Sequence, residues 1–517
     1  MYAMAGSIHA NLVYKPPKLK TQVNCIIHPF DTRKRNFLVA PMPSALRSLL
    51  SIIQKSVDDI EATFEKRGFD FPSLDEPPSE RDSIRLESSV QAATALLTSA
   101  AYQLIANVQL PPSYIFNSLF GYYLPSALRA AMETNIVEIL REAGPQGMHV
   151  KEIAKKAQVD PTKLSSILGY LATYHIFREI EPDVYANNRL SSVWDTEKSL
   201  EEIKESPMAK FNGTNGIAAL IGHCADEDYK GAGQIADHIM TPETAFEDSP
   251  ERSPLMTALG YDKGSMWSWF EEPSNEMRLR RFGIAMNGVN SLQPPDAILK
   301  GFDWASLPEG SVIVDVGGGI GVSAISIVRA FGHLKCIVQD RAMVLKLGTE
   351  HCQKLLPDAL SSGKIEYHEH DFFEAQPQTS ATVFLLKQIT HDWSDRYVTR
   401  ILQRLRDAAT PTTMLVIVDT IINHPCPSPP SNILGANLPA PPPPLLANLG
   451  VANASTHFAD LSMFVHFNAQ ERTLAHMVEL LAGTGWEVIR VYRSDDSGGY
   501  LPQIVATPVP SPALVKE

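Results

Sequence analysis

The sequence predicts an α/β protein in which an open, mostly parallel sheet follows a smaller and mostly helical domain. From residue 302 onward, short β-branched runs alternate with amphipathic stretches of helical period, which is typical of strand–helix–strand units. The segment 311–321, SVIVDVGGGIG, is an apolar run followed by an acid and a cluster of glycines. A stretch of helical pattern comes directly after it. This pattern indicates the first strand, turn and helix of a parallel sheet. Residues 110–194 instead carry short helical patterns followed by a hairpin pattern, a winged-helix arrangement.

The composition describes a soluble protein with more than one domain. Its 517 residues, 44% hydrophobic and 20% charged, suffice for a large core. The formal net charge of −13 disfavours nucleic acid and anionic membrane surfaces as partners. The five cysteines lack C-x-x-C spacing, which offers neither a disulfide framework nor a zinc site, and no apolar run has the length of a membrane span. We therefore expect a cytoplasmic protein without nucleic-acid, membrane or metal partners.

The N-terminal part is expected to divide into an extension and a helical domain. Residues 1–85 predict a poorly ordered extension with one or two helices, one of them near 43–66. Residues 86–200 predict the winged-helix domain. Its expected elements are helices over 88–108, 125–143, 150–157 and 162–174 and a hairpin over 177–185. Winged helices either read DNA or form dimers; because the last helix offers only Lys163 as a base, we expect a homodimer.

Residues 201–300 predict a helical linker that contributes to a substrate pocket. The stretches 265–270 and 282–287 are rich in aromatic residues and methionine. Such residues ordinarily pack in a core, and we expect some of them to line a pocket for an aromatic ligand as well. Met286 here and Met463 further along the chain are the candidate substrate contacts.

The sheet domain is expected over residues 301–517. Predicted strands cover 311–316, 335–339, 365–370, 382–386, 413–418, 487–492 and 503–507, and predicted helices begin at 322, 341, 394 and 471. The connection between the last two strands is too short for a crossover helix, which predicts an antiparallel hairpin. The proline-rich run 425–444 predicts an exposed, irregular and disordered loop inserted after strand 413–418.

The glycine cluster has the spacing G-x-G-x-G, with glycines at 317, 319 and 321 and Asp315 before them. A dinucleotide fingerprint, G-x-G-x-x-G, would place glycine where Val322 stands. The acid and the tighter spacing resemble motif I of class I S-adenosylmethionine (SAM) methyltransferases. That resemblance implies that Asp315, Gly317 and Gly319 hold the methionine end of SAM.

Polar residues follow several predicted strands at their carboxyl ends, where ligands of open α/β sheets bind. They are Asp315, Asp340, Asp371, Lys387 and Asp419, with His391 just beyond the fourth strand. Asp340 lies about twenty residues past the glycine loop, the usual distance of an acid that binds ribose hydroxyls. Asp371 and Phe372 offer an acceptor and an aromatic face for adenine. For any single acid, capping of the next helix remains an alternative.

The segment 386–395, LKQITHDWSD, resembles the corresponding segment of the plant and fungal small-molecule O-methyltransferases of the caffeic-acid type. The resemblance covers about residues 110–507. It implies a Rossmann-like class I methyltransferase sheet preceded by a mostly helical winged-helix dimerisation domain, with SAM as cofactor, which Lys387 helps to bind, and His391 as general base. Asp419 and Glu471 match the two acids that orient this base. The family usually has glutamate at the first, so Asp419 is shorter by one methylene; the proline-rich insertion is a second departure.

The chemistry agrees with this resemblance, because a phenol with a pKa of ~10 is protonated in the cell and needs a base. We therefore expect a SAM-dependent O-methyltransferase of a small phenolic or polyketide-like aromatic metabolite. Two alternatives remain open. An NAD(P)-dependent oxidoreductase is disfavoured by Val322, and a non-catalytic winged-helix regulator or scaffold is disfavoured by the intact His391.

Overall fold

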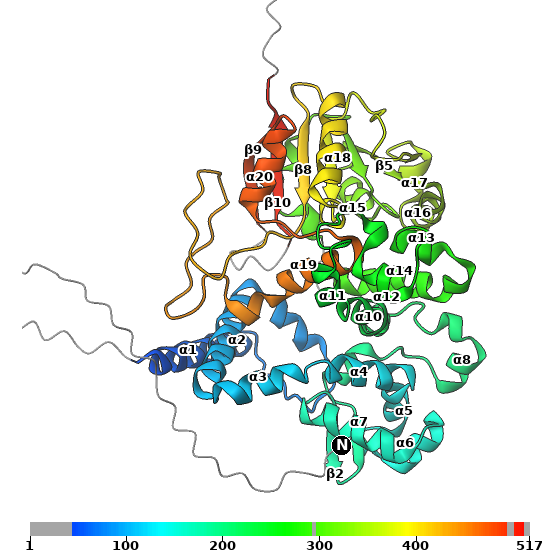
Figure 1. Cartoon of the computed structure of the whole chain (residues 1–517), viewed down its shortest axis with the longest axis vertical. Coiled ribbons are helices and arrows are strands. Elements are labelled where there is room, and N and C mark those ends of the chain that lie inside the picture. The colour runs from blue at the N-terminus through cyan, green and yellow to red at the C-terminus, as the bar shows by residue number, and fades with distance from the viewer. Residues whose placement is uncertain (1–43, 292–295, 494–500, 511–517) are drawn as a thin grey trace, which may run out of the picture. The chain divides into compact units, whose positions relative to one another are not determined.

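The computed structural model describes residues 44–291, 296–493 and 501–510. The chain divides into two units, residues 1–43 and 44–517. The first unit, which holds half of the predicted extension, lies outside the described residues. All that follows concerns the second unit (Figure 1).

Residues 44–85 are folded, which corrects the expectation of a poorly ordered extension for this part of it. Helix α1 (Ala45–Lys66) packs against α2 (Ser88–Val108), and a 3-10 helix, η1 (Glu80–Leu86), lies between them in the sequence. The small core under these helices contains Phe64 and Val90. The apolar stripe of α1 thus has a partner, which the charged composition of the segment concealed.

The winged-helix region contains helices and a small sheet. The helices are α3 (Pro111–Leu119), α4 (Tyr123–Glu133), α5 (Ile136–Ala143), α6 (Val150–Ala157) and α7 (Pro161–Thr173), and the strands are β1 (Met148–His149), β2 (Arg178–Glu181) and β3 (Val184–Ala186). The strands pair antiparallel in the order β1-β3-β2, so the predicted hairpin is confirmed. The single helix predicted over 125–143 is wrong. It breaks at Asn135, whose φ of 57° is a left-handed conformation that asparagine tolerates.

The next segment is helical, as predicted. Its elements are α8 (Leu200–Glu205), α9 (Ile217–His223), a π-helical turn η4 (Cys224–Asp228), α10 (Tyr229–Ala232), α11 (Ile235–Met240), α12 (Pro254–Leu259), α13 (Met266–Glu271) and α14 (Glu276–Ser291). Buried Asp226 in η4 pairs with Arg278 of α14 at 2.5 Å and with Arg129 of α4 at 2.9 Å. These ion pairs join the winged-helix region to the helices that follow it.

The large sheet has seven strands in the order β6-β5-β4-β7-β8-β10-β9. The strands are β4 (Val312–Val316), β5 (Lys335–Asp340), β6 (Ile365–Glu369), β7 (Val383–Lys387), β8 (Met414–Val418), β9 (Trp486–Tyr492) and β10 (Gln503–Pro508). The β6-β5-β4-β7-β8 part is parallel, whereas β10 runs antiparallel to both β8 and β9. The predicted parallel sheet with a final antiparallel hairpin is therefore confirmed.

Helices cover both faces of this sheet because successive strand residues point to opposite sides. On β4, Ile313 packs in one core with α15 (Val322–Ala330) and α16 (Ala342–Leu355), close to α17 (Pro357–Ser361). The next residue, Val314, packs in the opposite core with α18 (Asp395–Ala408) and α20 (Leu474–Gly483). The carboxyl ends of the parallel strands are left for the polar loops.

Two findings between β8 and β9 were not predicted. Helix α19 (Ala454–Phe467) follows the proline-rich run, and α20 begins at Leu474, three residues after the predicted start at Glu471. Glu471 therefore lies in the connection between these helices. The run 425–444 forms no helix or regular strand, as predicted, but the expected disorder is wrong, because hydrogen bonds hold its base and middle. Ala447 N donates to Pro425 O at 3.0 Å, and Val491 N of edge strand β9 donates to Leu434 O at 2.9 Å.

Among the described residues, no helix is both long enough and apolar enough to cross a bilayer.

We expect the chain to dimerise through the winged-helix region, because α3 and its flanks expose apolar side chains. Leu110, Phe116 and Leu119 are 60–72% exposed. The wild type should scatter light as about twice its 56.9 kDa. Changing Phe116 to Asp should raise the dimer dissociation constant by ~10²-fold or more. Burial of one phenylalanine side chain is worth about 1.5–3 kcal/mol, and a twofold interface buries Phe116 of both subunits. Phe246→Asp, at a fully exposed position outside this region, is the control. A monomeric wild type would contradict the prediction.

Candidate active site

The glycine loop after β4 is built around a buried carboxylate. Asp315 is 2% exposed, and a Cβ on Gly318 would lie only 2.6 Å from its Cγ, so a side chain at 318 would collide with the acid. Burial raises the pKa of Asp315 to about 7, although the charge of Lys387 opposes this. Among the described residues, none donates a hydrogen bond to Asp315 Oδ2. A buried acceptor without a donor suits a cationic or N–H-bearing ligand group.

Asp340 joins the end of β5 to the same loop. Its Oδ2 accepts a hydrogen bond from Gly319 N at 2.9 Å, and its Oδ1 accepts one from Arg341 N at 2.7 Å. Gly319 has a φ of +60°, and no described atom lies within 4 Å of where its Cβ would stand. The backbone of the loop therefore borders open space beside the carboxylate predicted to hold the ribose. These residues fit the methionine and ribose ends of SAM.

Asp371 and Phe372 lie in the turn after β6. Asp371 Oδ1 accepts a hydrogen bond from Phe373 N at 2.9 Å, so this acid does cap a turn. The Phe372 ring lies edge-on to that of Trp393, with centroids 5.8 Å apart, and 3.6 Å from where a Cβ on Gly317 would stand. The structure thus brings Phe372 to the glycine loop, and its contact with the adenine of SAM stays a prediction.

Lys387 is the last residue of β7 and is half-buried. Its Nζ donates to Gln388 Oε1 at 3.1 Å. Burial lowers the pKa of Lys387, whereas the carboxylates of Asp315 and Asp419 act against that shift. The ammonium group of Lys387 therefore interacts with two carboxylates, that of Asp315 in the glycine loop and that of Asp419 after β8.

His391 lies in a 3-10 turn, η9 (Thr390–Asp392), and contacts two carboxylates. Its Nδ1 is 2.8 Å from Glu471 Oε1, and its Nε2 is 3.5 Å from Asp392 Oδ1. Burial alone would lower the pKa of His391. The charges of Asp392, Glu471 and Asp419 outweigh burial and raise it to about 10.

Asp419 supports this histidine through its charge and not through a hydrogen bond to the ring. Its Oδ2 accepts a short hydrogen bond from Thr390 Oγ1, the residue before His391. Burial raises the pKa of Asp419 to about 6 and that of Asp392 to about 7. Asp419 thus binds the residue before His391 and not the ring.

Sequence reasoning missed three residues that shape the turn: Thr390, Asp392 and Arg472. Arg472 is 3% exposed; its Nη1 donates to Thr390 O at 2.7 Å and its Nη2 to Trp393 O at 2.6 Å. A buried guanidinium thus fixes the backbone on both sides of His391. Its place directly after Glu471 was the available signal.

The structure does not bring the two predicted substrate contacts into one cluster. Met286 on α14 packs against the core of the winged-helix region. Met463 on α19 packs against a separate cluster that contains Met266, Phe270 and Phe467. Met463 lies on α19, which also packs against η9.

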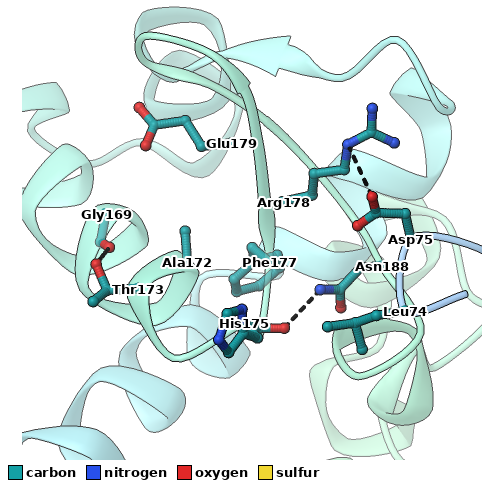
Figure 2. Close-up of a pocket in the computed structure, with 10 residues that line it drawn as sticks. All are labelled: Leu74, Asp75, Gly169, Ala172, Thr173, His175, Phe177, Arg178, Glu179 and Asn188. Atoms are coloured by element: carbon teal, nitrogen blue, oxygen red, sulfur yellow. Dashed lines mark hydrogen bonds and ion pairs between the residues drawn. The ribbon is translucent and has the colours of Figure 1, made fainter.

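A shallow cavity of about 340 Å³ lies away from these strand ends, in the winged-helix region (Figure 2). It is lined by the end of α7, by β2 and by the segment containing Leu74 and Asp75. Arg178 reaches Asp75 at 3.9 Å, and Asn188 Nδ2 donates to His175 O at 2.6 Å. Its polar groups therefore contact one another, and we assign it no part in the chemistry.

The fold and the strand-end residues define the class of Rossmann-like methyltransferases, and comparisons with known proteins specify the family. A family profile described as the O-methyltransferase domain matches residues 253–436, and one described as the O-methyltransferase dimerisation domain matches residues 116–197. 4-O-methyltransferase 1 of Phanerochaete chrysosporium is 39% identical, over 90% of this chain and 100% of its own length. An O-methyltransferase of Armillaria gallica is 37% identical over the same shares.

The chain belongs to the SAM-dependent O-methyltransferase family. Human N-acetylserotonin methyltransferase in complex with SAM has a similar fold, with a TM-score of 0.56 and 19% identity over 78% of this chain and 99% of that one. SAM is the cofactor, and the protein is an enzyme. The matches do not support the oxidoreductase or the non-catalytic scaffold. The four domain ranges stay predictions, since the two profiles match only residues 116–197 and 253–436.

We expect Gly319→Ala and Asp340→Ala to weaken SAM binding, measured by calorimetry. The first fills the space beside the loop, and the second removes an acceptor of charge-assisted hydrogen bonds worth about 1.5–3 kcal/mol, roughly 10- to 10²-fold in affinity.

Gly310→Ala is the matched control, because Gly310 also has a positive φ, +77°, and open space around it, but lies before the opposite end of β4. It should lose similar stability and keep wild-type affinity for SAM. Unchanged SAM affinity in both site variants would contradict the assignment.

Proposed function

We propose that this enzyme transfers the methyl group of SAM to a hydroxyl of a small phenolic or polyketide-like aromatic metabolite, with His391 as general base. The observation that carries the proposal is the 2.8 Å contact between His391 Nδ1 and Glu471 Oε1. A carboxylate that accepts the Nδ1 proton fixes the tautomer in which Nε2 is the basic nitrogen.

The proton of the acceptor hydroxyl is the chemical obstacle. A phenol titrates near pKa ~10, so its oxygen is a weak nucleophile until a base takes the proton. Bound SAM supplies an electrophilic methyl group. His391 Nε2 accepts the phenol proton as the oxygen attacks, and Glu471 stabilises the imidazolium that forms. Because the carboxylates raise the pKa of His391, its neutral form is a stronger base than an ordinary histidine.

Support for an aromatic acceptor comes from α19, which packs against η9, and from the aromatic cluster that packs with it. The Trp267 ring stacks on that of Phe467 of α19 with centroids 5.4 Å apart, and it meets the Phe282 ring edge-on at 5.6 Å. Met463 belongs to the same cluster. Flat rings and flexible thioethers are surfaces on which planar ligands pack well. We propose Met463, and Met286 more peripherally, as contacts of the acceptor.

His391→Ala should lower turnover by about 10²- to 10⁴-fold, the range for a lost general base. Its affinity for SAM should stay within about twofold, because the histidine serves the acceptor. Turnover is measured as methylated product by mass spectrometry, with an acceptor found by screening phenols. An alanine variant with wild-type turnover would remove His391 from the mechanism.

The pH dependence of kcat/KM should show how far the carboxylates around His391 raise its pKa. The base works only when neutral, so kcat/KM should rise with pH along a limb above the ordinary histidine pKa of ~6.5. Glu471→Gln removes a negative charge that favours the imidazolium, so the limb should move to lower pH while turnover falls. Asp419→Asn should move the limb in the same direction and lower turnover less, because Asp419 binds Thr390 and not the ring. A wild-type limb at or below 6.5 would contradict the raised pKa.

A further inference from the structure

Helix α19, which the sequence analysis did not predict, reaches the connection that carries Glu471. Asp460 lies in the middle of this helix, and its Oδ1 accepts a hydrogen bond from the backbone N–H of Glu471 at 2.9 Å. The bond spans eleven residues and joins the helix to the segment that follows it. It is therefore a tertiary contact and not a cap of α19 itself.

The segment that Asp460 holds makes two of the connections to the turn of His391. Glu471 contacts the ring at Nδ1, and Arg472 holds the backbone of the turn through Thr390 O and Trp393 O. The segment begins at Asn468, which ends α19 in a left-handed conformation with a φ of 53°. The Glu471 amide is thus one of the points at which this short, irregular connection is anchored.

Asp460 is suited to this role by its surroundings. It is half-buried, and burial raises its pKa, as does the nearby carboxylate of Glu471. The Glu471 amide, His457 and Arg472 favour its ionised form. The carboxylate of Asp460 thus has attractive neighbours, His457 and Arg472, and one repulsive neighbour, the carboxylate of Glu471. We expect this arrangement to hold the oxygen that accepts from Glu471 N in one position.

We propose that Asp460 is a positioning residue for the general base: it fixes the backbone of Glu471, and through Glu471 it sets the place of the His391 ring. This role rests on the proposed function of His391. The same helix carries Met463, the proposed substrate contact, less than one turn further on. Helix α19 would therefore both contact the methyl acceptor and hold Glu471, the partner of His391.

The test compares Asp460→Ala with Asp460→Asn in the full-length protein. Alanine removes the acceptor for Glu471 N, whereas asparagine keeps an acceptor oxygen at the same distance along the side chain. Alanine should lower kcat by about 10- to 10²-fold, the scale expected when a reacting group is displaced by up to an ångström. It should also move the ascending pH limb downward, toward that of Glu471→Gln. Asparagine should restore kcat to within about threefold of the wild type. If the alanine variant does not fold, Asp460→Glu, which displaces the acceptor by one methylene, takes its place and should fall below asparagine.

Ser462→Ala is the matched control on the same helix. Ser462 Oγ donates to Asp228 Oδ2 at 3.0 Å, away from Glu471, and its removal should leave kcat and the pH limb unchanged. A merely structural role of Asp460 would lower the melting temperature of both Asp460 variants and leave the limb in place.

Repeating the Asp460 test in the His391→Ala variant separates the role of Asp460 from the proposed role of His391. In His391→Ala, the further change Asp460→Ala should cause no additional loss of turnover, because its effect passes through the absent ring. A full additional loss there, wild-type kcat of Asp460→Ala, or equal damage by alanine and asparagine would overturn the role of Asp460 alone. Wild-type turnover of His391→Ala would instead overturn the proposed base, and this role with it.

Discussion

The hydrogen bond between His391 Nδ1 and Glu471 Oε1 joins two distant parts of the chain, and the rest of the site is arranged to maintain it. Three carboxylates, those of Asp392, Asp419 and Glu471, surround one imidazole in a buried place. Desolvation raises the pKa values of Asp392 and Asp419, whereas the pKa of His391 rises because the carboxylate charges outweigh desolvation. The charges of His391, Asp392 and Asp419 therefore depend on one another.

Maintaining this cluster costs stability, and the cost is visible in the structure. Among the described residues, no hydrogen-bond partner faces Asp419 Oδ1 or Glu471 Oε2, although both atoms are buried. Unpaired buried carboxylate oxygens destabilise a fold. Arg472 and Thr390 offset part of this by fixing the turn around His391. Departures of this kind from ordinary packing are expected at functional sites, where reactivity matters more than stability.

Much of the fold was predictable because its signals are local. The glycine loop, the run of strands and the final hairpin follow from residue type and spacing, and the residues at the strand ends follow from the rule that parallel strands finish at one rim. The break at Asn135 depends on one left-handed residue, and β1 is too short to show a period. Helix α19 was missed because the proline-rich run before it suggested an extended irregular region. The partners of Asp419, Asp460 and Arg472 could not be predicted, since each is a tertiary contact between segments whose relative positions sequence alone leaves open.

The central claim is that carboxylates hold His391 in one tautomer and raise its pKa. Nitrogen NMR of the ¹⁵N-histidine-labelled protein, assigned through His391→Gln and titrated with and without SAM, measures both quantities directly. We expect a ring protonated at Nδ1 in its neutral form, with a pKa well above ~6.5 that falls in Glu471→Gln. A neutral ring protonated at Nε2, or a pKa at or below ~6.5 that Glu471→Gln leaves unchanged, would contradict it.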